Sequence, residues 1–193
     1  KVSVDGVTYA LPEPFMVIAT QNPFGSVGTQ KLPESQMDRF MIRVTMGYPS
    51  VEDEVSIMKS KTGGLSNRVL SKNVINAQDF MAMRDIVDEV YVDDSIYEYV
   101  AKIVAKTRDS DDILQGISPR GSISIINMAK AEAFLRGHDY VLPSDIQFVL
   151  NDTMAHRIIL NRSLKRGHIT EESVIDSICR SVDVPKIGTR GIL

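Results

Sequence analysis

The apolar run from Phe15 to Ala19 constrains the fold most, because it carries an apolar side chain at every position. A strand that is covered on both faces, as in a parallel sheet, has this pattern. Polar Asn22 follows closely, and open α/β sheets place ligand-facing groups at the carboxyl ends of their strands. Beyond a loop, a short amphipathic segment presents Arg39, whose permanent charge suits a phosphate group, often on a neighbouring subunit. The sequence therefore predicts part of an α/β ligand-binding fold.

Three further elements are predicted before Pro49. Residues 2 to 9 alternate around Asp5-Gly6, which is a two-residue hairpin signal. Residues 33 to 40 have room for about two helical turns, and residues 41 to 46 form a second predicted strand. Two strands and a hairpin do not make a stable sheet. We therefore expect the rest of this sheet to be missing, so that the strands at 15–19 and 41–46 expose edges and apolar faces and this half is rearranged, paired with another chain or aggregation-prone, while the lid stays folded.

From Ser50 onward the pattern becomes helical. Apolar residues recur at helical spacing, and the helix beginning at Ser118-Pro119 is predicted to turn Ile123, Ile126, Ala129 and Ala133 inward. The predicted helix starts are Ser50, Asn76, Asp93 or Asp94, Ser118, a Ser144-x-x-Gln147 capping box, and Thr170. We therefore predict an α/β remnant at 1–49 followed by an all-α domain at 50–193.

Composition excludes several function classes. The net charge of −3 gives no electrostatic argument for nucleic acid as a partner. No apolar run is long enough for a membrane span, and no signal peptide is recognised. The single Cys179 cannot form an internal disulfide, which fits a reducing cytoplasm, and a buried structural thiol is its simplest role. Because the chain begins at Lys1, we expect it to be a fragment.

The run from Ala19 to Phe40 resembles the MoxR branch of the AAA+ ATPases. It reads Ala-Thr-Gln-Asn-Pro, then Gly-Thr, then Leu-Pro-Glu-Ser-Gln-Met-Asp-Arg-Phe, and it departs from the family pattern at Ser35 and Met37. The resemblance continues along the chain at Lys106-Thr107-Arg108, Ile117–Arg120, Ala131–Ile146, Ala155–Ile158 and Val182–Pro185, with His138 in place of arginine. It implies the end of a nucleotide-binding core (1–49) and a helical lid domain (50–193).

The resemblance also implies roles for three polar residues. Asn22 matches sensor 1, which orients the attacking water and meets a phosphate oxygen, although Asn22-Pro23 is also a turn signal. Arg39 matches the arginine finger that reaches the neighbouring subunit's nucleotide, with an intrachain ion pair as the alternative. Arg120 matches sensor 2, which touches the nucleotide phosphates from the start of a helix, with a purely structural arginine as the alternative. Together they would form one catalytic centre contributed by two subunits.

Other residues carry weaker hypotheses. Glu34 is a candidate for pairing with an arginine across a subunit interface, and a solvated helix-cap acid is an equal alternative. We assign His156 and Arg157 a structural role within the lid. The three histidines have no metal-ligand spacing with one another or with Cys179, so no metal site is predicted.

The chain lacks two elements that ATP hydrolysis requires. None of the 193 residues forms a Gly-x-x-x-x-Gly-Lys-Ser/Thr loop, and no apolar strand ends in Asp-Glu. We therefore expect this chain alone to be inactive and to hold no ATP or Mg²⁺, which the full-length protein would use.

For the full-length protein the resemblance implies a homo-oligomeric ring, expected as a hexamer. Such a ring would remodel or mature client proteins, often with partners that contain von Willebrand factor A domains. Two other classes stay open. One is a stand-alone helical interaction module that needs no nucleotide, and the other is a DNA-directed AAA+ motor, which would need a basic stripe or inserted hairpin.

Overall fold

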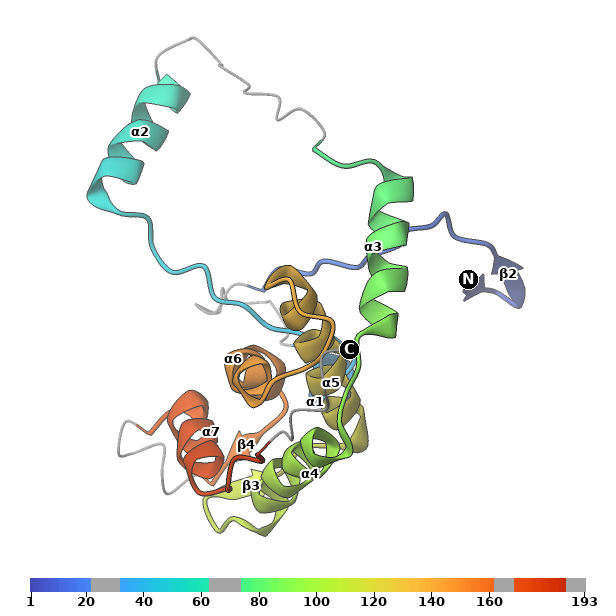
Figure 1. Ribbon diagram of the computed structural model, residues 1–193. Helices are drawn as coiled ribbons and strands as arrows, with labels where there is room; N and C mark the ends of the chain where they lie inside the picture. Colours follow the sequence, from blue (N-terminus) through green and yellow to red (C-terminus); the bar gives the residue numbers. More distant parts are fainter. Residues whose placement is uncertain (22–31, 63–73, 162–168, 187–193) are drawn as a thin grey trace. The chain divides into compact units, whose positions relative to one another are not determined.

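The computed structural model describes residues 1–21, 32–62, 74–161 and 169–186 (Figure 1). Asn22 lies outside these residues. The backbone contacts divide the chain into two compact units, one of Lys1–Pro14 with Val44–Met81 and one of Phe15–Arg43 with Ala82–Leu193. We describe each unit by itself.

The first unit contains the predicted hairpin. Strands β1 (Val2–Val4) and β2 (Val7–Tyr9) pair antiparallel, with Val4 opposite Val7. Asp5 and Gly6 both have positive φ, at 50° and 79°, as a two-residue turn of the primed type requires. The Asp5-Gly6 turn prediction is therefore confirmed.

Helix α2 (Val51–Thr62) starts where Ser50 predicts. The Ser50 hydroxyl accepts the backbone N–H of Asp53 at 3.1 Å. Helix α3 (Ala77–Glu89) starts after Asn76 in the same way, because the Asn76 side chain accepts the backbone N–H of Asp79 at 2.9 Å. Both predicted helix starts are confirmed, and both depend on local hydrogen bonds.

The second unit is a helical domain built on α4 (Asp94–Asp109), α5 (Pro119–Leu135), α6 (Pro143–Met154) and α7 (Glu171–Arg180). Helices α5 and α6 pack against each other, while α4 contacts α5 and α7, and α6 contacts α7 (Figure 1). The fully buried side chains include Ile96, Tyr99, Ile103, Ile117, Ile125, Ile146, Met154, Leu160 and Ile175. These side chains form the apolar core that the helices of this unit share.

A small sheet in this domain was not predicted. Strand β3 (Ile113–Gln115) pairs antiparallel with β4 (Ile159–Leu160). Strands of two and three residues are too short to show an alternating pattern. The pair joins the chain before α5 to the chain after α6, and so it helps to place the residues around Ser118 beside those around Arg157.

The predicted strands at 15–19 and 41–46 are wrong for this structure, in which both segments are irregular. Phe15 to Ile18 are exposed, with Ile18 at 83%. A strand of a parallel sheet depends on neighbouring strands for its hydrogen bonds and for cover on its faces. The described residues supply no such neighbours. Helix α1 (Glu34–Met37) is also shorter than the two predicted turns.

Two details of the predicted helices also need correction. Ile123 is 62% exposed, and Ile125 is buried together with Ala129 and Ala133. Ile123 lies about 200° around the helix from Ile125, so the two cannot share one face. Helix α6 begins after Leu142, where the Asp145 carboxylate accepts the Leu142 backbone N–H at 2.8 Å, and not at the predicted Ser144 cap.

Among the residues that the structure describes, no helix is both long enough and apolar enough to cross a membrane.

Candidate functional site

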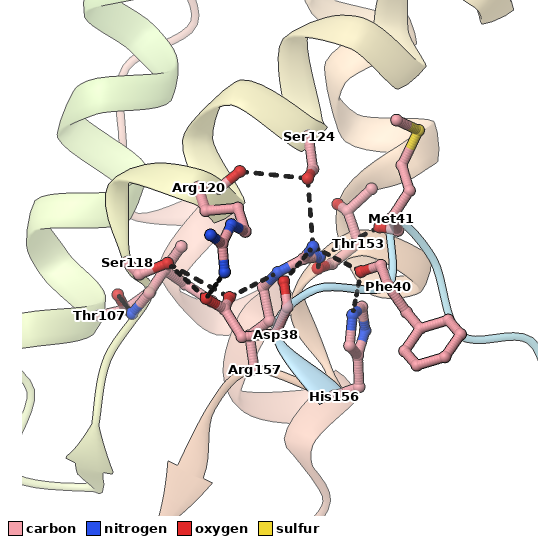
Figure 2. A network of polar contacts seen from close by, with 11 residues as sticks. Asp38, Phe40, Met41, Thr107, Ser118, Arg120, Ser124, Thr153, His156 and Arg157 are labelled. Carbon is pink, nitrogen blue, oxygen red and sulfur yellow. Dashed lines mark hydrogen bonds and ion pairs between the residues drawn. The ribbon is translucent and has the colours of Figure 1, made fainter. Parts of the chain in front are cut away.

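The Asp38 carboxylate, just after α1, is the centre of a polar network within the second unit (Figure 2). The Ser118 hydroxyl donates to both of its oxygens, at 3.2 and 3.1 Å. Arg157 Nε donates to Oδ1 at 3.1 Å, and Arg120 Nη1 lies 3.6 Å from Oδ2. One carboxylate, 26% exposed, therefore faces two guanidinium groups.

Arg157 holds the residues that follow α1 against the lid helices. Its side chain is 1% exposed and comes from the turn after α6. Besides Asp38 Oδ1, its guanidinium donates to three carbonyls of the segment after α1, to the hydroxyl of Ser124 and to a carbonyl of α6 (Figure 2). The carbonyl acceptors are Phe40 at 2.6 Å, Met41 at 3.1 Å, Asp38 at 3.2 Å, and Thr153.

These contacts satisfy a charge that would otherwise be costly to bury. Desolvation lowers the pKa of Arg157 below its ordinary value, while the Asp38 carboxylate opposes that change. The guanidinium thus clamps residues 38 to 41 to α6. This arrangement agrees with the structural role that the sequence suggested for Arg157.

His156 adds a second contact to the same segment. Its Nε2 lies 3.0 Å from the carbonyl oxygen of Phe40. Because a carbonyl only accepts, Nε2 must carry the proton, and Nδ1 then holds the lone pair. Nδ1 is buried and has no hydrogen-bond partner among the described residues. Desolvation lowers the pKa of His156, so the ring is neutral in the folded protein at neutral pH.

The residues at the start of α5 contact this network and leave room for the Arg157 side chain. Ser118 is the residue before α5, but its hydroxyl does not cap the helix and binds Asp38 instead. Gly121 leaves room for the arginine, because a Cβ there would lie 3.1 Å from Arg157 Cδ and only 2.4 Å from Ile117 Cγ2. The sequence Ser118-Pro119-Arg120-Gly121 therefore combines a helix start with a close approach by Arg157.

Arg120, one of the predicted site residues, lies in the first turn of α5 with its side chain 56% exposed. Backbone N–H groups at a helix start favour anions, and the arginine adds a full charge. Its present partner, Asp38, is itself an anion at 3.6 Å. This local chemistry fits a phosphate group.

Arg39, the second predicted site residue, is exposed. Within the described residues, its guanidinium forms no hydrogen bond or ion pair, while its backbone N–H is fixed to the Gln36 carbonyl at 3.1 Å. The alternative of an ion pair with Asp38 or Glu34 is therefore not observed. The neighbours of Arg39 on both sides, Asp38 and Phe40, are held by Arg157.

Glu34 is exposed in the first turn of α1 and lines a cleft of about 250 Å³ that Ser35, Asp38, Gly116, Ser118 and His156 also border. The structure therefore brings Glu34 and Asp38 to the same cleft. No set of His, Cys, Asp or Glu side chains in the described ranges is suited to hold a metal ion. Sequence reasoning missed Asp38, although its place directly before Arg39 was a usable signal.

Comparisons with known proteins agree with the two-part architecture. Residues 1–42 match the family model described as "ATPase family associated with various cellular activities (AAA)". Residues 105–178 match the model of the AAA lid domain. The boundary between 49 and 50 lies between these two matches and stays a prediction.

The chain is also similar to longer proteins. It is 41% identical over 184 residues to the uncharacterized protein YeaC of Bacillus subtilis, covering 95% of this chain and 57% of that protein. It is 33% identical over 195 residues to the chaperone MoxR1 of Mycobacterium tuberculosis, covering 96% of this chain and 51% of that one. The crystal structure of a "putative ATPase" from Cytophaga hutchinsonii is 34% identical, with a TM-score of 0.84, covering 96% of this chain and 58% of that one. The chain therefore spans between half and three fifths of the length of these relatives.

Proposed function

Because the chain belongs to the MoxR family of AAA+ ATPases and carries the lid region of that family, we propose that the full-length protein couples ATP binding and hydrolysis to chaperone-like remodelling or maturation of client proteins. In this proposal Arg120 binds a phosphate of the nucleotide in its own subunit. Arg39 reaches the nucleotide of the neighbouring subunit, and Asn22 orients the attacking water.

The observation that supports this assignment best is the state of the two arginines. Among the described residues, the Arg120 side chain is held only by an ion pair with a carboxylate, at 3.6 Å, and it can exchange that anion for a phosphate. Arg39 is exposed and has no partner among the described residues, although the chain on both sides of it is fixed. An arginine with a rigid backbone and an unpaired guanidinium is suited to act on a second subunit.

The residues of this chain fit one part of the cofactor chemistry. When bound, ATP with Mg²⁺ supplies the phosphoanhydride bond that is hydrolysed and the metal charge that the reaction needs. Arg120 would contribute a positive charge to a phosphate oxygen. The described residues offer no cluster of metal-binding side chains, so Mg²⁺ would be held by other parts of the full-length protein.

We also propose that the 193-residue chain alone does not hydrolyse ATP. Its sequence contains neither the phosphate-binding loop nor the Asp-Glu strand that the reaction requires. A steady ATP turnover by the purified chain, above that of a preparation carrying Arg39→Ala, would contradict this proposal.

The assembly is proposed to be a homo-oligomeric ring, as a hexamer, located in the cytoplasm. A finger that acts on the next subunit requires a head-to-tail interface, and such interfaces form rings when the rotation from one subunit to the next closes. The similarity to a protein named chaperone MoxR1 supports client proteins as the substrates, with von Willebrand factor A domain proteins as candidate partners. The net charge of −3 gives no support for nucleic acid.

Two other functions make different predictions. A helical interaction module without nucleotide predicts that Arg39 and Arg120 are dispensable. A DNA-directed motor predicts DNA-stimulated hydrolysis that weakens steeply with salt. Neither is favoured by a specific observation in the described residues.

The test is the ATPase activity of the full-length protein and two variants. Arg39→Ala is expected to lower kcat by about 10³-fold or more, as for arginine fingers in related chemistry, while ATP still binds. Arg120→Ala is expected to weaken ATP binding. Arg84→Ala is the matched control, because Arg84 is exposed and its nearest carboxylate is the adjacent Asp85 at 3.9 Å. Wild-type activity in both Arg39→Ala and Arg120→Ala would refute the proposed site.

A further inference from the structure

Asp38 contacts Arg120, which is proposed to bind the nucleotide of its own subunit. It also directly precedes Arg39, which is proposed to reach the nucleotide of the next subunit. Its Oδ2 faces Arg120 at 3.6 Å, and it is bonded through the main chain to Arg39. Resting on the proposed function, we propose that Asp38 is a positioning residue that couples the nucleotide contact of Arg120 to the placement of Arg39 toward the neighbouring subunit.

The first step is the difference between the two ion pairs of Asp38. The pair with Arg157 is a hydrogen bond of 3.1 Å to a side chain that is 1% exposed. The pair with Arg120 is longer, at 3.6 Å, and its guanidinium is 56% exposed. Exposed ion pairs contribute little and exchange readily, whereas a buried charge must keep its partner. Arg157 therefore stays on Asp38, and Arg120 is the partner that can leave.

The second step is competition between anions. A nucleotide phosphate carries more charge than a carboxylate and binds guanidinium groups strongly. The same N–H groups of Arg120 cannot bind the Asp38 carboxylate and a phosphate at the same time. Nucleotide binding therefore separates Arg120 from Asp38, and Asp38 must weaken nucleotide binding by holding Arg120 in the absence of nucleotide.

The third step is the transmission to Arg39. After Arg120 leaves, the Ser118 hydroxyl, at 3.1 Å, is the one partner of Asp38 Oδ2 that remains among the described residues, and the charge balance around the carboxylate changes. The main chain at Asp38 is held through its carbonyl by Arg157 Nη2 at 3.2 Å and through its N–H by the Glu34 carbonyl at 2.9 Å. Because the main chain stays in place, the loss of Arg120 changes the charge next to Arg39 and not the position of its backbone, and the exposed Arg39 guanidinium is oriented by that charge. Reaction rates are sensitive to displacements of about 1 Å in such groups.

Asp38→Asn in the full-length protein tests the coupling, because the amide keeps the size of the side chain and removes its charge. We expect ATP to bind about twofold to fivefold more tightly, since Arg120 is released from its exposed pair. We expect kcat to fall by about tenfold to a hundredfold, since Arg39 is no longer positioned. A merely structural role would weaken binding and turnover together. Unchanged or weaker ATP binding would overturn the proposal.

A double-variant cycle adds a second readout. If Asp38 acts through Arg39, the variant carrying both Asp38→Asn and Arg39→Ala should have the kcat of Arg39→Ala within about twofold. A kcat in the double variant that is lowered by the product of the two single-variant losses would overturn the proposal. Arg84→Ala serves again as the control with wild-type binding and turnover.

Ser118→Ala keeps the proposal testable if Asp38→Asn does not assemble. Removing this hydroxyl leaves Asp38 more strongly dependent on Arg120, so ATP binding should become weaker, in the direction opposite to Asp38→Asn. Tighter or unchanged binding would count against the proposal. Wild-type turnover in Arg39→Ala would instead mean that the proposed finger itself is wrong, which separates the failure of the proposed function from the failure of this inference.

Discussion

At the scale of single residues, Arg157 joins the segment after α1 to the lid helices. It is 1% exposed and donates to Asp38, to Ser124 and to carbonyls on both sides of the contact. Truncating it to Ala would leave the Asp38 carboxylate and several carbonyls without their donor. Removing one partner of a buried ion pair typically costs about 3–5 kcal/mol.

Arg157→Ala is therefore expected to lower the free energy of unfolding of the lid by about 3 kcal/mol. Arg157→Lys should lie between this variant and the wild type, because an ammonium keeps the charge but not the planar fork. Urea unfolding followed by helical circular dichroism measures both. The exposed Arg84→Ala should change the value by less than about 0.5 kcal/mol. Equal stability of Arg157→Ala and wild type would contradict the clamp.

His156 gives the network a dependence on pH. Burial lowers its pKa from the ordinary value of 6.5, so the folded state binds fewer protons than the unfolded state as pH falls below that value. The contribution of His156 to stability is therefore complete above pH 6.5 and is lost as pH falls from 6.5 through the lower folded-state pKa. Protonation would also place a second N–H at the buried Nδ1, which has no described acceptor.

The expected outcome is a urea midpoint that falls between pH 7.5 and 5 more in the wild type than in His156→Gln. Comparison with the glutamine variant removes the contributions of the other titrating groups to the pH dependence of stability, because those groups are present in both proteins. Parallel pH profiles for the two proteins would show that burial of His156 does not couple to folding.

At the scale of elements, Asp145 determines the start of α6. It is fully buried, accepts the Leu142 backbone N–H at 2.8 Å, and faces Arg136 Nη1 at 3.6 Å. The exposed Ser144, which the sequence pattern favours as a cap, makes no such contact. A carboxylate near a helix start is also favoured by the helix dipole.

Asp145→Ala is accordingly expected to destabilise the lid by about 2 kcal/mol, through the loss of the cap and of a charge partner for Arg136. Ser144→Ala is the matched control, one residue away, and should cost less than about 0.5 kcal/mol. Thermal or urea unfolding of the two variants measures both losses of stability. A larger loss in Ser144→Ala than in Asp145→Ala would contradict this assignment and support the capping box predicted from sequence.

The helix starts show which parts of this fold can be predicted from the sequence. Ser50, Asn76 and Thr170 were identified correctly, since each accepts a backbone N–H only a few residues away. Ser118 was identified as a helix start, but its hydroxyl donates a hydrogen bond to Asp38, 80 residues earlier in the chain. Local rules cannot anticipate such a distant partner. The same reason explains why β3 and β4 were missed, since each is defined only by the other.

At the scale of the whole molecule, the sequence resemblance identified the family and the architecture, and the comparisons confirm both. The residues at 15–19 and 41–46 have strand-like sequences but are irregular here, because strand formation depends on neighbours that the described chain does not supply. The Asp38–Arg157 contact joins residues 119 positions apart and could not be derived from spacing. The roles of Asn22, Arg39 and Arg120 stay proposals.

The central claim is that Arg39 of one subunit completes the nucleotide site of the next. It is tested most directly by mixing two inactive full-length proteins. One carries Arg39→Ala and keeps its nucleotide site, and the other lacks a working phosphate-binding loop but keeps Arg39. Mixed rings should regain ATP hydrolysis, up to about a quarter of the wild-type rate per subunit for random 1:1 assembly, because a competent site then meets an intact finger at a head-to-tail interface. Mixed rings that stay as inactive as either parent would contradict the claim.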